Sequence, residues 1–190
     1  DDAVTLALTY AEIPYDVVFD DEVMYDKLPE YDWLHLHHED FTGQYGKFYR
    51  IYRNTPWYIE RQRKYEETAR KHGFDKVSQL KLAVVKKIRD FVSGGGFMFA
   101  MCSATDTYDN ALAADGVDIV ESMYDGDRAN PNAQEKLNYA NTFAFQDFKL
   151  VRNPYEYEYS SIDVDPSSRG LSQDNDYFNL FEFSAKWDPI

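Results

Sequence analysis

The feature that most constrains the fold is the stretch 78–114, where Cys102, the single cysteine of the chain, stands between two helix patterns. The glycines Gly94, Gly95 and Gly96 can end the first helix, because glycine adopts the left-handed conformation that a helix exit needs. Before them, apolar residues recur at helical spacing, namely Leu80, Val84, Val85, Ile88, Phe91 and Val92. The pattern therefore predicts a helix that begins at Ser78 and ends at the glycines.

A short apolar run, Phe97–Met101, follows the glycines and leads directly to Cys102. Such a run is typical of a strand that is buried on both faces, as in a parallel sheet. A second helix is expected from Ser103 to about Gly116. Strand, cysteine and helix in this order predict a nucleophile elbow, in which N–H groups at the helix start favour a thiolate and stabilise an oxyanion.

The neighbours of Cys102 bear on whether the elbow forms. Ala100 and Ala104 are small enough for the crowded turn, although glycine is commoner at both places. The alternative is that Cys102 is a small apolar residue buried at a strand end, as free cysteines often are. Both interpretations remain open at this point.

A histidine-rich segment is the second informative stretch. Residues Trp33–His37 predict a strand, and ligands of open α/β sheets bind beyond the carboxyl ends of the strands. The loop 41–46 that comes next is polar and contains Gly43 and Gly46, as expected near a site. Candidates for the wall of an active site are therefore His37, His38, Glu39, Asp40 and Gly43, with Ser103 from the second helix.

Other roles for these histidines are open. Imidazole and carboxylate ligands suit a transition metal, which His35, His37, His38 and Glu39 or Asp40 could share in part. Neighbouring strand residues point apart, so not all of them could reach one ion. The side chains could also be packed and hydrogen-bonded for structural reasons alone. We expect no metal and no cofactor.

Composition limits the partners. The net charge is −14 and the pI is near 4.6, which argues against nucleic acid and anionic membranes as partners. No apolar run is long enough to span a bilayer. One cysteine permits no intrachain disulfide, so the cellular compartment is undecided. The length of 190 residues suits one domain, and the first and last residues, Asp1 and Ile190, suggest an excerpt of a longer protein.

The remaining elements complete the expected architecture. The acidic residues 20–22 are expected to cap a helix, and the charged helix from Trp57 to about His72 is expected to be solvated. The acidic segment 125–132 is either an ordinary loop or a weak calcium site that lacks the usual spacing. Further strands are predicted at 15–19, 117–120, 142–151, 155–159 and 181–183.

With these elements placed, the sequence resembles the class I glutamine amidotransferase-like superfamily over roughly residues 3–120. The resemblance rests on three motifs, at 32–37, 91–96 and 100–104. Within it, the chain is most similar to a poorly characterised group labelled "asparagine synthetase B". The ATP loop of asparagine synthetases, Ser-Gly-Gly-x-Asp-Ser, is not matched, because Gly96, Phe97 and Met98 follow the serine and glycines here. Asparagine synthesis and ATP use are therefore not expected.

The resemblance implies a three-layer α/β fold of flavodoxin-like type, with a mostly parallel sheet and extra strands and loops toward the C-terminus. It implies that Cys102 is a nucleophile that forms a thioester with an amide substrate. It also implies an oxyanion hole made by backbone amides near Ser103 and after the strand Trp33–His37.

One departure concerns the catalytic base. The histidine of the family follows the cysteine, usually as His-x-Glu, whereas all four histidines here precede Cys102, at positions 35, 37, 38 and 72. The histidine could lie in sequence beyond Ile190, or His37 or His38 could replace it. A third possibility is that the site is not a glutaminase.

Three functions follow as hypotheses. The first is a cysteine hydrolase or amidotransferase centred on Cys102. The second is a non-catalytic binding or scaffold module for a sugar, a peptide or a protein, which the aromatic residues of 48–53 and 155–159 would suit. The third is a metal-dependent hydrolase. The partner is a small molecule or a protein, and the oligomeric state is undecided.

Overall fold

A computed structural model describes residues 3–163 of the chain. In these residues helices predominate, and two short strands form one sheet. The 3₁₀ turns are η1 (Leu28–Glu30), η2 (Tyr45–Lys47) and η3 (Tyr139–Asn141). The strands are β1 (Trp33–Leu36) and β2 (Phe97–Ala100), and the helices are α1 (Ala3–Tyr10), α2 (Asp20–Met24), α3 (Tyr49–Tyr52), α4 (Pro56–Lys71), α5 (Val77–Ser93), α6 (Ser103–Ala113), α7 (Ser122–Asp125) and α8 (Ala133–Lys136).

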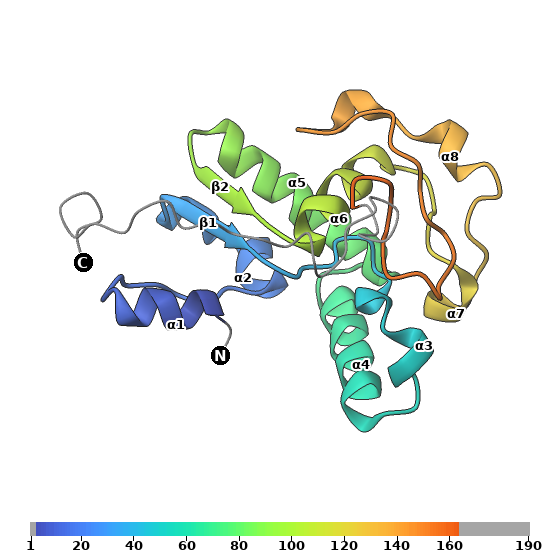
Figure 1. The fold of residues 1–190 in the computed structure, drawn as a ribbon, viewed down its shortest axis with the longest axis horizontal. Helices are drawn as coiled ribbons and strands as arrows, with labels where there is room; N and C mark the ends of the chain where they lie inside the picture. Colours follow the sequence, from blue (N-terminus) through green and yellow to red (C-terminus); the bar gives the residue numbers. More distant parts are fainter. Residues whose placement is uncertain (1–2, 164–190) are drawn as a thin grey trace, which may run out of the picture.

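The two strands are parallel, and their register pairs Trp33 with Phe97 and Leu36 with Ala100. The chain between them supplies the crossover, which includes α4 and α5 (Figure 1). A further backbone hydrogen bond, from Met101 N–H to the Leu36 carbonyl at 3.1 Å, extends the pairing by one residue. The register therefore brings the end of β1, where the histidines stand, beside the residues that lead to Cys102.

The two faces of this sheet differ. On the inner face, Leu34 and Leu36 are buried and belong to the main hydrophobic cluster, against which Met98 and Ala100 also pack. On the other face the aromatic side chains of Trp33, Phe97 and Phe99 are exposed. The prediction that β2 is buried on both faces was therefore wrong, because no described layer covers the outer side.

Helix α5 organises the core. Its apolar positions Leu80, Val84, Val85 and Ile88 are all buried, as the periodicity predicted. It contacts α2, α4 and α6, so it is the helix against which these three pack. The predicted helices around Cys102 are confirmed as α5 and α6, and the charged helix is confirmed as α4.

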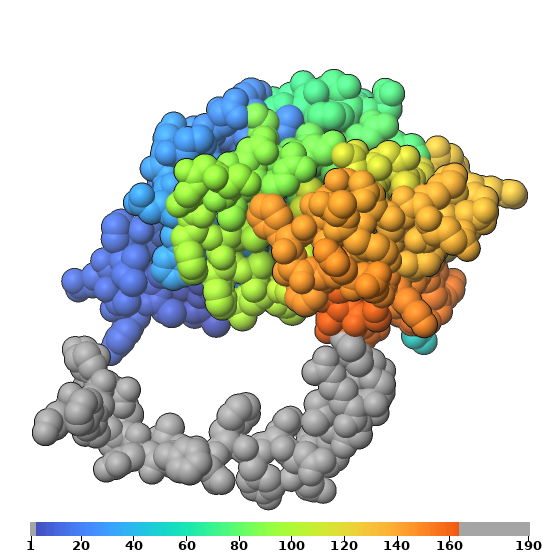
Figure 2. Space-filling view, turned by 90° about the horizontal axis from the view of Figure 1, so that it is seen from above, coloured from blue at the N-terminus to red at the C-terminus, as the bar shows by residue number. Residues whose placement is uncertain are grey.

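The segments that follow α6 form no sheet. The predicted strands at 117–120, 142–151 and 155–159 are turns, bends and irregular chain, apart from an isolated antiparallel bridge between Leu150 and Ser160. The predicted strand at 15–19 is irregular too. In the space-filling view the segments that follow α6, coloured from yellow to red, lie together on one part of the surface (Figure 2).

Two buried carboxylates of α6 explain this irregular path. Asp109 accepts hydrogen bonds from the backbone N–H groups of Phe143, Ala144 and Phe145, at 2.8–2.9 Å. Asp106 accepts the N–H groups of Tyr159 and Ser160, at 3.1 and 2.9 Å. Backbone donors in a folded chain need partners, and here a side chain satisfies donors that a neighbouring strand would otherwise bind.

The fold prediction is thus corrected. A three-layer flavodoxin-like α/β sheet is contradicted, because residues 3–163 contain one sheet of two strands and are mostly helical. The description of the chain as flavodoxin-like is therefore wrong as well. The local unit of α5, β2, Cys102 and α6 remains.

One further expectation, the last strand at 181–183, concerns residues outside the described part. Across residues 3–163, no helix combines the length and the apolar character that crossing a membrane requires.

Candidate active site at Cys102

Cys102 lies at the turn between β2 and α6, with φ 55° and ψ −140°. A positive φ is uncommon for a residue other than glycine, and it marks backbone strain that is often found at functional sites. The side chain is exposed, so the sulfur is accessible to a reagent or substrate. Ala104 is completely buried in the turn that follows, which leaves no space for a larger side chain there.

The start of α6 supplies hydrogen-bond donors next to this sulfur. The first N–H groups of a helix have no partner within the helix. Thr105 N–H already bonds back to the Cys102 carbonyl at 3.1 Å, while the N–H groups of Ser103 and Ala104 come before it in the first turn. Ser103 itself is buried and lines a pocket. Donors at this place can stabilise an anion that forms beside Cys102.

The three neighbouring histidines separate into different surroundings. The ring of His35 stacks on Phe99, with 5.4 Å between the ring centroids, on the exposed face of the sheet. The rings of His37 and His38 stack on each other at 3.8 Å, just after β1 ends. Of the three, only His38 lines the pocket that Ser103 also lines.

Glu39 and Asp40 hold the loop after β1 in place. The Glu39 carboxylate accepts the His37 N–H at 2.6 Å, and the Glu39 carbonyl accepts the Thr107 hydroxyl at 2.8 Å. Asp40 accepts the N–H groups of Thr42 and Gly46 at 2.7 and 2.8 Å, and the Thr42 hydroxyl at 2.6 Å. Both acids therefore act first as structural anchors of the histidine loop.

Gly43 is required by its surroundings. Its φ is 85°, and a Cβ built on it would stand 2.8 Å from the backbone nitrogen of Ser78. No other residue fits this approach without moving the start of α5 away from the loop. Gly43 thus fixes the distance between the loop and α5, and it lies on the pocket wall.

The pocket has a volume of about 320 Å³, at the lower end of the range for small-molecule sites. Helices α4 and α5 form a second wall with Arg61, Tyr65, Val77 and Lys81. Tyr157 comes from the C-terminal segment. The loop and the elbow contribute the remaining residues, His38, Asp40, Gly43, Tyr45, Gly46, Phe48 and Ser103.

Tyr157 connects the pocket with the cysteine. Burial raises the pKa of its phenol, and the nearby Cys102 adds to the effect. The ring of Tyr157 also lies 6.2 Å from that of Phe48, centroid to centroid. The pocket therefore has an aromatic side next to the elbow.

Of the residues predicted for the site, the structure gathers His38, Asp40, Gly43 and Ser103 around this pocket and places Cys102 directly before Ser103. His37 and Glu39 support the loop and do not line the pocket.

Sequence reasoning missed Arg61, Tyr65, Lys81 and Tyr157 as pocket residues. The helix that carries Arg61 and Tyr65 was interpreted as a solvated surface because of its charges, and only its tertiary position gives them a place on the wall. The aromatic alternation at 155–159 did draw attention to Tyr157, although the strand expected there is absent.

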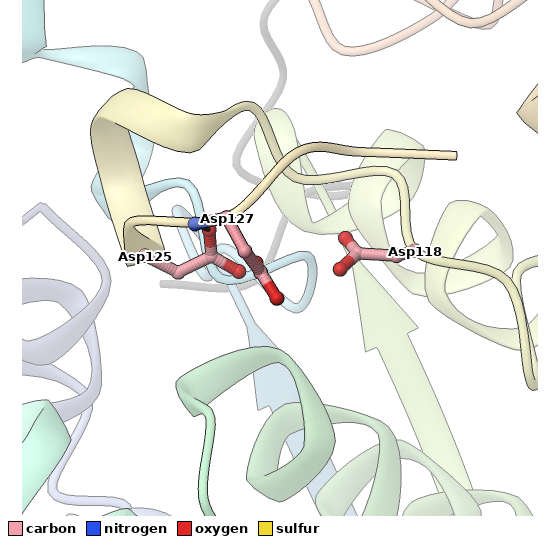
Figure 3. Close-up of side chains that lie close together, drawn as sticks. All are labelled: Asp118, Asp125 and Asp127. Atoms are coloured by element: carbon pink, nitrogen blue, oxygen red, sulfur yellow. Dashed lines mark hydrogen bonds between the residues drawn. The ribbon is translucent and has the colours of Figure 1, made fainter. Parts of the chain in front are cut away.

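The metal hypothesis for the histidines receives no geometric support. In residues 3–163, the one group whose ligand atoms lie within 4.8 Å of one another is Asp118, Asp125 and Asp127, far along the chain from the histidines. These carboxylates converge from α7 and the loops on either side of it (Figure 3).

An ammonium group is bound among these three aspartates. Lys76 Nζ lies 2.6 Å from Asp118, 3.1 Å from Asp125 and 2.5 Å from Asp127. Burial lowers the pKa of Lys76, but hydrogen bonds to the three carboxylates outweigh it and raise the pKa overall. At the start of the acidic loop 125–132, the ammonium of Lys76 therefore occupies the place of the calcium ion that the sequence offered as an alternative.

Comparison with known proteins gives no relative on which to base a function: no protein-family model, curated protein or solved structure matches this chain.

Proposed function

We propose that this chain is a glutamine amidotransferase-like cysteine enzyme, which cleaves a small amide through a covalent thioester on Cys102. The observation that carries the proposal is the backbone of Cys102, strained at a positive φ between a strand and a helix start, with an exposed sulfur. Such backbone strain is typical of a nucleophile elbow, in which the sharp turn exposes the nucleophilic side chain.

The proposed reaction begins when the Cys102 thiol gives its proton to a histidine and its sulfur attacks the amide carbonyl carbon. The negative charge on the carbonyl oxygen is stabilised by the N–H of Ser103. The C–N bond then breaks, and the histidine returns the proton to the leaving amine. Water hydrolyses the thioester and releases the carboxylic acid and the free thiol.

His38 is the preferred proton carrier of the two histidines proposed from the sequence, because it shares the pocket with Ser103. His37 stacks on it at 3.8 Å and holds the ring from one side. The stack gives His38 a defined position without a carboxylate of the kind that orients the base in a triad.

The experiment is a search for the covalent intermediate. Purified protein is mixed with glutamine and with a panel of small primary amides, quenched in acid and weighed by mass spectrometry, while released ammonia is measured. We expect an acyl adduct and ammonia with the wild type, neither with Cys102→Ser, and slower release with His38→Gln. An unmodified wild-type mass with every amide, and no ammonia, would count against the proposal.

A non-catalytic binding module is the second candidate. It is favoured by one observation: among residues 3–163, no carboxylate forms a hydrogen bond or an ion pair with the ring of His38, so the usual orienting partner of a catalytic histidine is not supplied there. A thermal-shift screen with sugars and short peptides separates the two. Saturable stabilisation that survives Cys102→Ser, without any turnover, would favour the binding module.

A further inference from the structure

Arg61 differs from most other cations of α4 in lacking an acidic partner. Arg63 pairs with Glu60 and Glu67 at 2.7 and 2.9 Å, and Lys71 pairs with Asp21 at 2.6 Å. The guanidinium of Arg61 forms no ion pair with any residue in the described range and lies 5.9 Å from the centroid of the Trp57 ring. Lys64 also lacks a carboxylate, but its ammonium lies over the Phe19 ring, outside the pocket.

The other charges of the pocket are already engaged. Lys81 is buried and bonded to Asp20, with its nitrogen 2.7 Å from one carboxylate oxygen and 3.0 Å from the other. Asp40 accepts three hydrogen bonds from its own loop. In a chain with a net charge of −14, the unpaired guanidinium of Arg61 is the one positive group that the described residues 3–163 leave available to a ligand on this pocket wall.

The pocket is continuous with the elbow. Ser103, the residue after Cys102, lies on its wall, and so does Tyr157, which also lies near Cys102. A molecule that fills the 320 Å³ between these walls therefore has one end beside the donors of the α6 start and another end within the reach of α4.

We propose that Arg61 binds an anionic group of the substrate, so that the enzyme selects small amides that carry a carboxylate or a phosphate away from the reacting carbonyl. This inference rests on the proposed function of Cys102. A planar guanidinium fits either anion with two parallel hydrogen bonds, and lysine does not reproduce this geometry. Trp57 supports the guanidinium from its other side through a cation–π contact.

The test uses alkylation of Cys102, which needs no knowledge of the substrate. The reagents are iodoacetamides with tails of increasing length, and each tail ends in a carboxylate, a phosphonate or an uncharged carboxamide. The variants are Arg61→Gln, Arg61→Lys and, as a control with the same charge change on the same helix, Arg70→Gln. Arg70 is exposed, its nearest carboxylate is 3.9 Å away, and it does not line the pocket.

We expect one tail length at which the anionic reagent labels the wild type about fivefold faster than its carboxamide twin, with less preference at high salt. Arg61→Gln should abolish this preference, Arg61→Lys should reduce it, and Arg70→Gln should keep it. The better of the carboxylate and phosphonate tails identifies the anion. Labelling with plain iodoacetamide should be equal in all variants.

Two results would overturn the inference: no charge preference at any tail length in the wild type, or a preference that persists in Arg61→Gln. Failure of the proposed function has a different signature. In that case plain iodoacetamide would label the folded protein no faster than the unfolded chain, whether or not the charged tails show a preference.

Discussion

Replacing Cys102 by glycine should make the protein more stable, because the strain at this position serves the side chain and not the fold. A non-glycine residue in an unfavourable backbone region costs about 1–3 kcal/mol. Glycine relieves this cost but gains about 0.4–1 kcal/mol of freedom in the unfolded chain. The exposed cysteine loses little burial when it is removed. The net expectation is a gain of about 0.5–2 kcal/mol in the free energy of unfolding.

Urea denaturation measures this gain. With a slope of about 2 kcal/mol per M, the midpoint for Cys102→Gly should rise by about 0.3–1 M. Cys102→Ala, which keeps the strain, should leave the midpoint near that of the wild type. Met101→Gly is the matched control, because Met101 is also exposed but has no positive φ, and it should lose about 0.5–1 kcal/mol. A Cys102→Gly variant no more stable than Cys102→Ala would refute the assigned strain.

Three further predictions concern charged side chains. Asp106→Ala leaves the buried N–H groups of Tyr159 and Ser160 without their acceptor, so the free energy of unfolding measured by urea denaturation should fall by about 2–5 kcal/mol. A decrease of less than about 1 kcal/mol would contradict the role of Asp106. Burial lowers the pKa of Lys47 to about 8 in the folded protein, so above pH 8 the unfolded chain keeps this proton while the folded protein loses it. The free energy of unfolding of the wild type should therefore rise relative to that of Lys47→Met by up to about 1.4 kcal/mol per pH unit above pH 8. Urea unfolding curves in which the two free energies differ by a constant amount from pH 7 to 9.5 would refute this. Lys76→Met leaves three aspartates together without their cation, and it should lower the free energy of unfolding by about 1–3 kcal/mol at low salt and by less at high salt. Thermal unfolding at two ionic strengths measures this loss of stability. A loss that does not change with salt would argue against repulsion between the aspartates.

The unit around Cys102 could be predicted because its signals are local. The periodicity of Leu80 to Ile88, the glycines and the short apolar run each act over a few residues, and the helices and strand formed where these patterns placed them. The parallel pairing of β1 and β2 followed from a crossover that contains helices.

The size of the sheet could not be predicted, because it depends on long-range partners. The aromatic segment at 143–145 alternates like a strand, but its N–H groups bond to Asp109, 34 to 36 residues earlier in the chain. No local pattern indicates that a helix carboxylate will replace a neighbouring strand. The same holds for Tyr159 and Asp106.

The candidate site was predictable in part for the same reason. His38, Asp40, Gly43 and Ser103 stand next to strand ends, where sequence rules expect ligands. Arg61 lies on a helix whose charges are mostly paired with one another, and a composition-based reading treats all of them alike. Only the three-dimensional structure shows that Arg61 lines the pocket, together with the loop that follows β1, whereas Arg63 on the same helix is paired with Glu60 and Glu67.

The most direct measurement of the central claim is the rate of Cys102 alkylation by iodoacetamide at pH 6.5, in the folded protein and in the chain unfolded by urea. We expect the folded protein to react about tenfold faster, since the exposed sulfur lies beside the hydrogen-bond donors at the start of α6, and we expect His38→Gln to reduce the difference. Equal rates in the two states, or slower labelling of the folded protein, would contradict this claim.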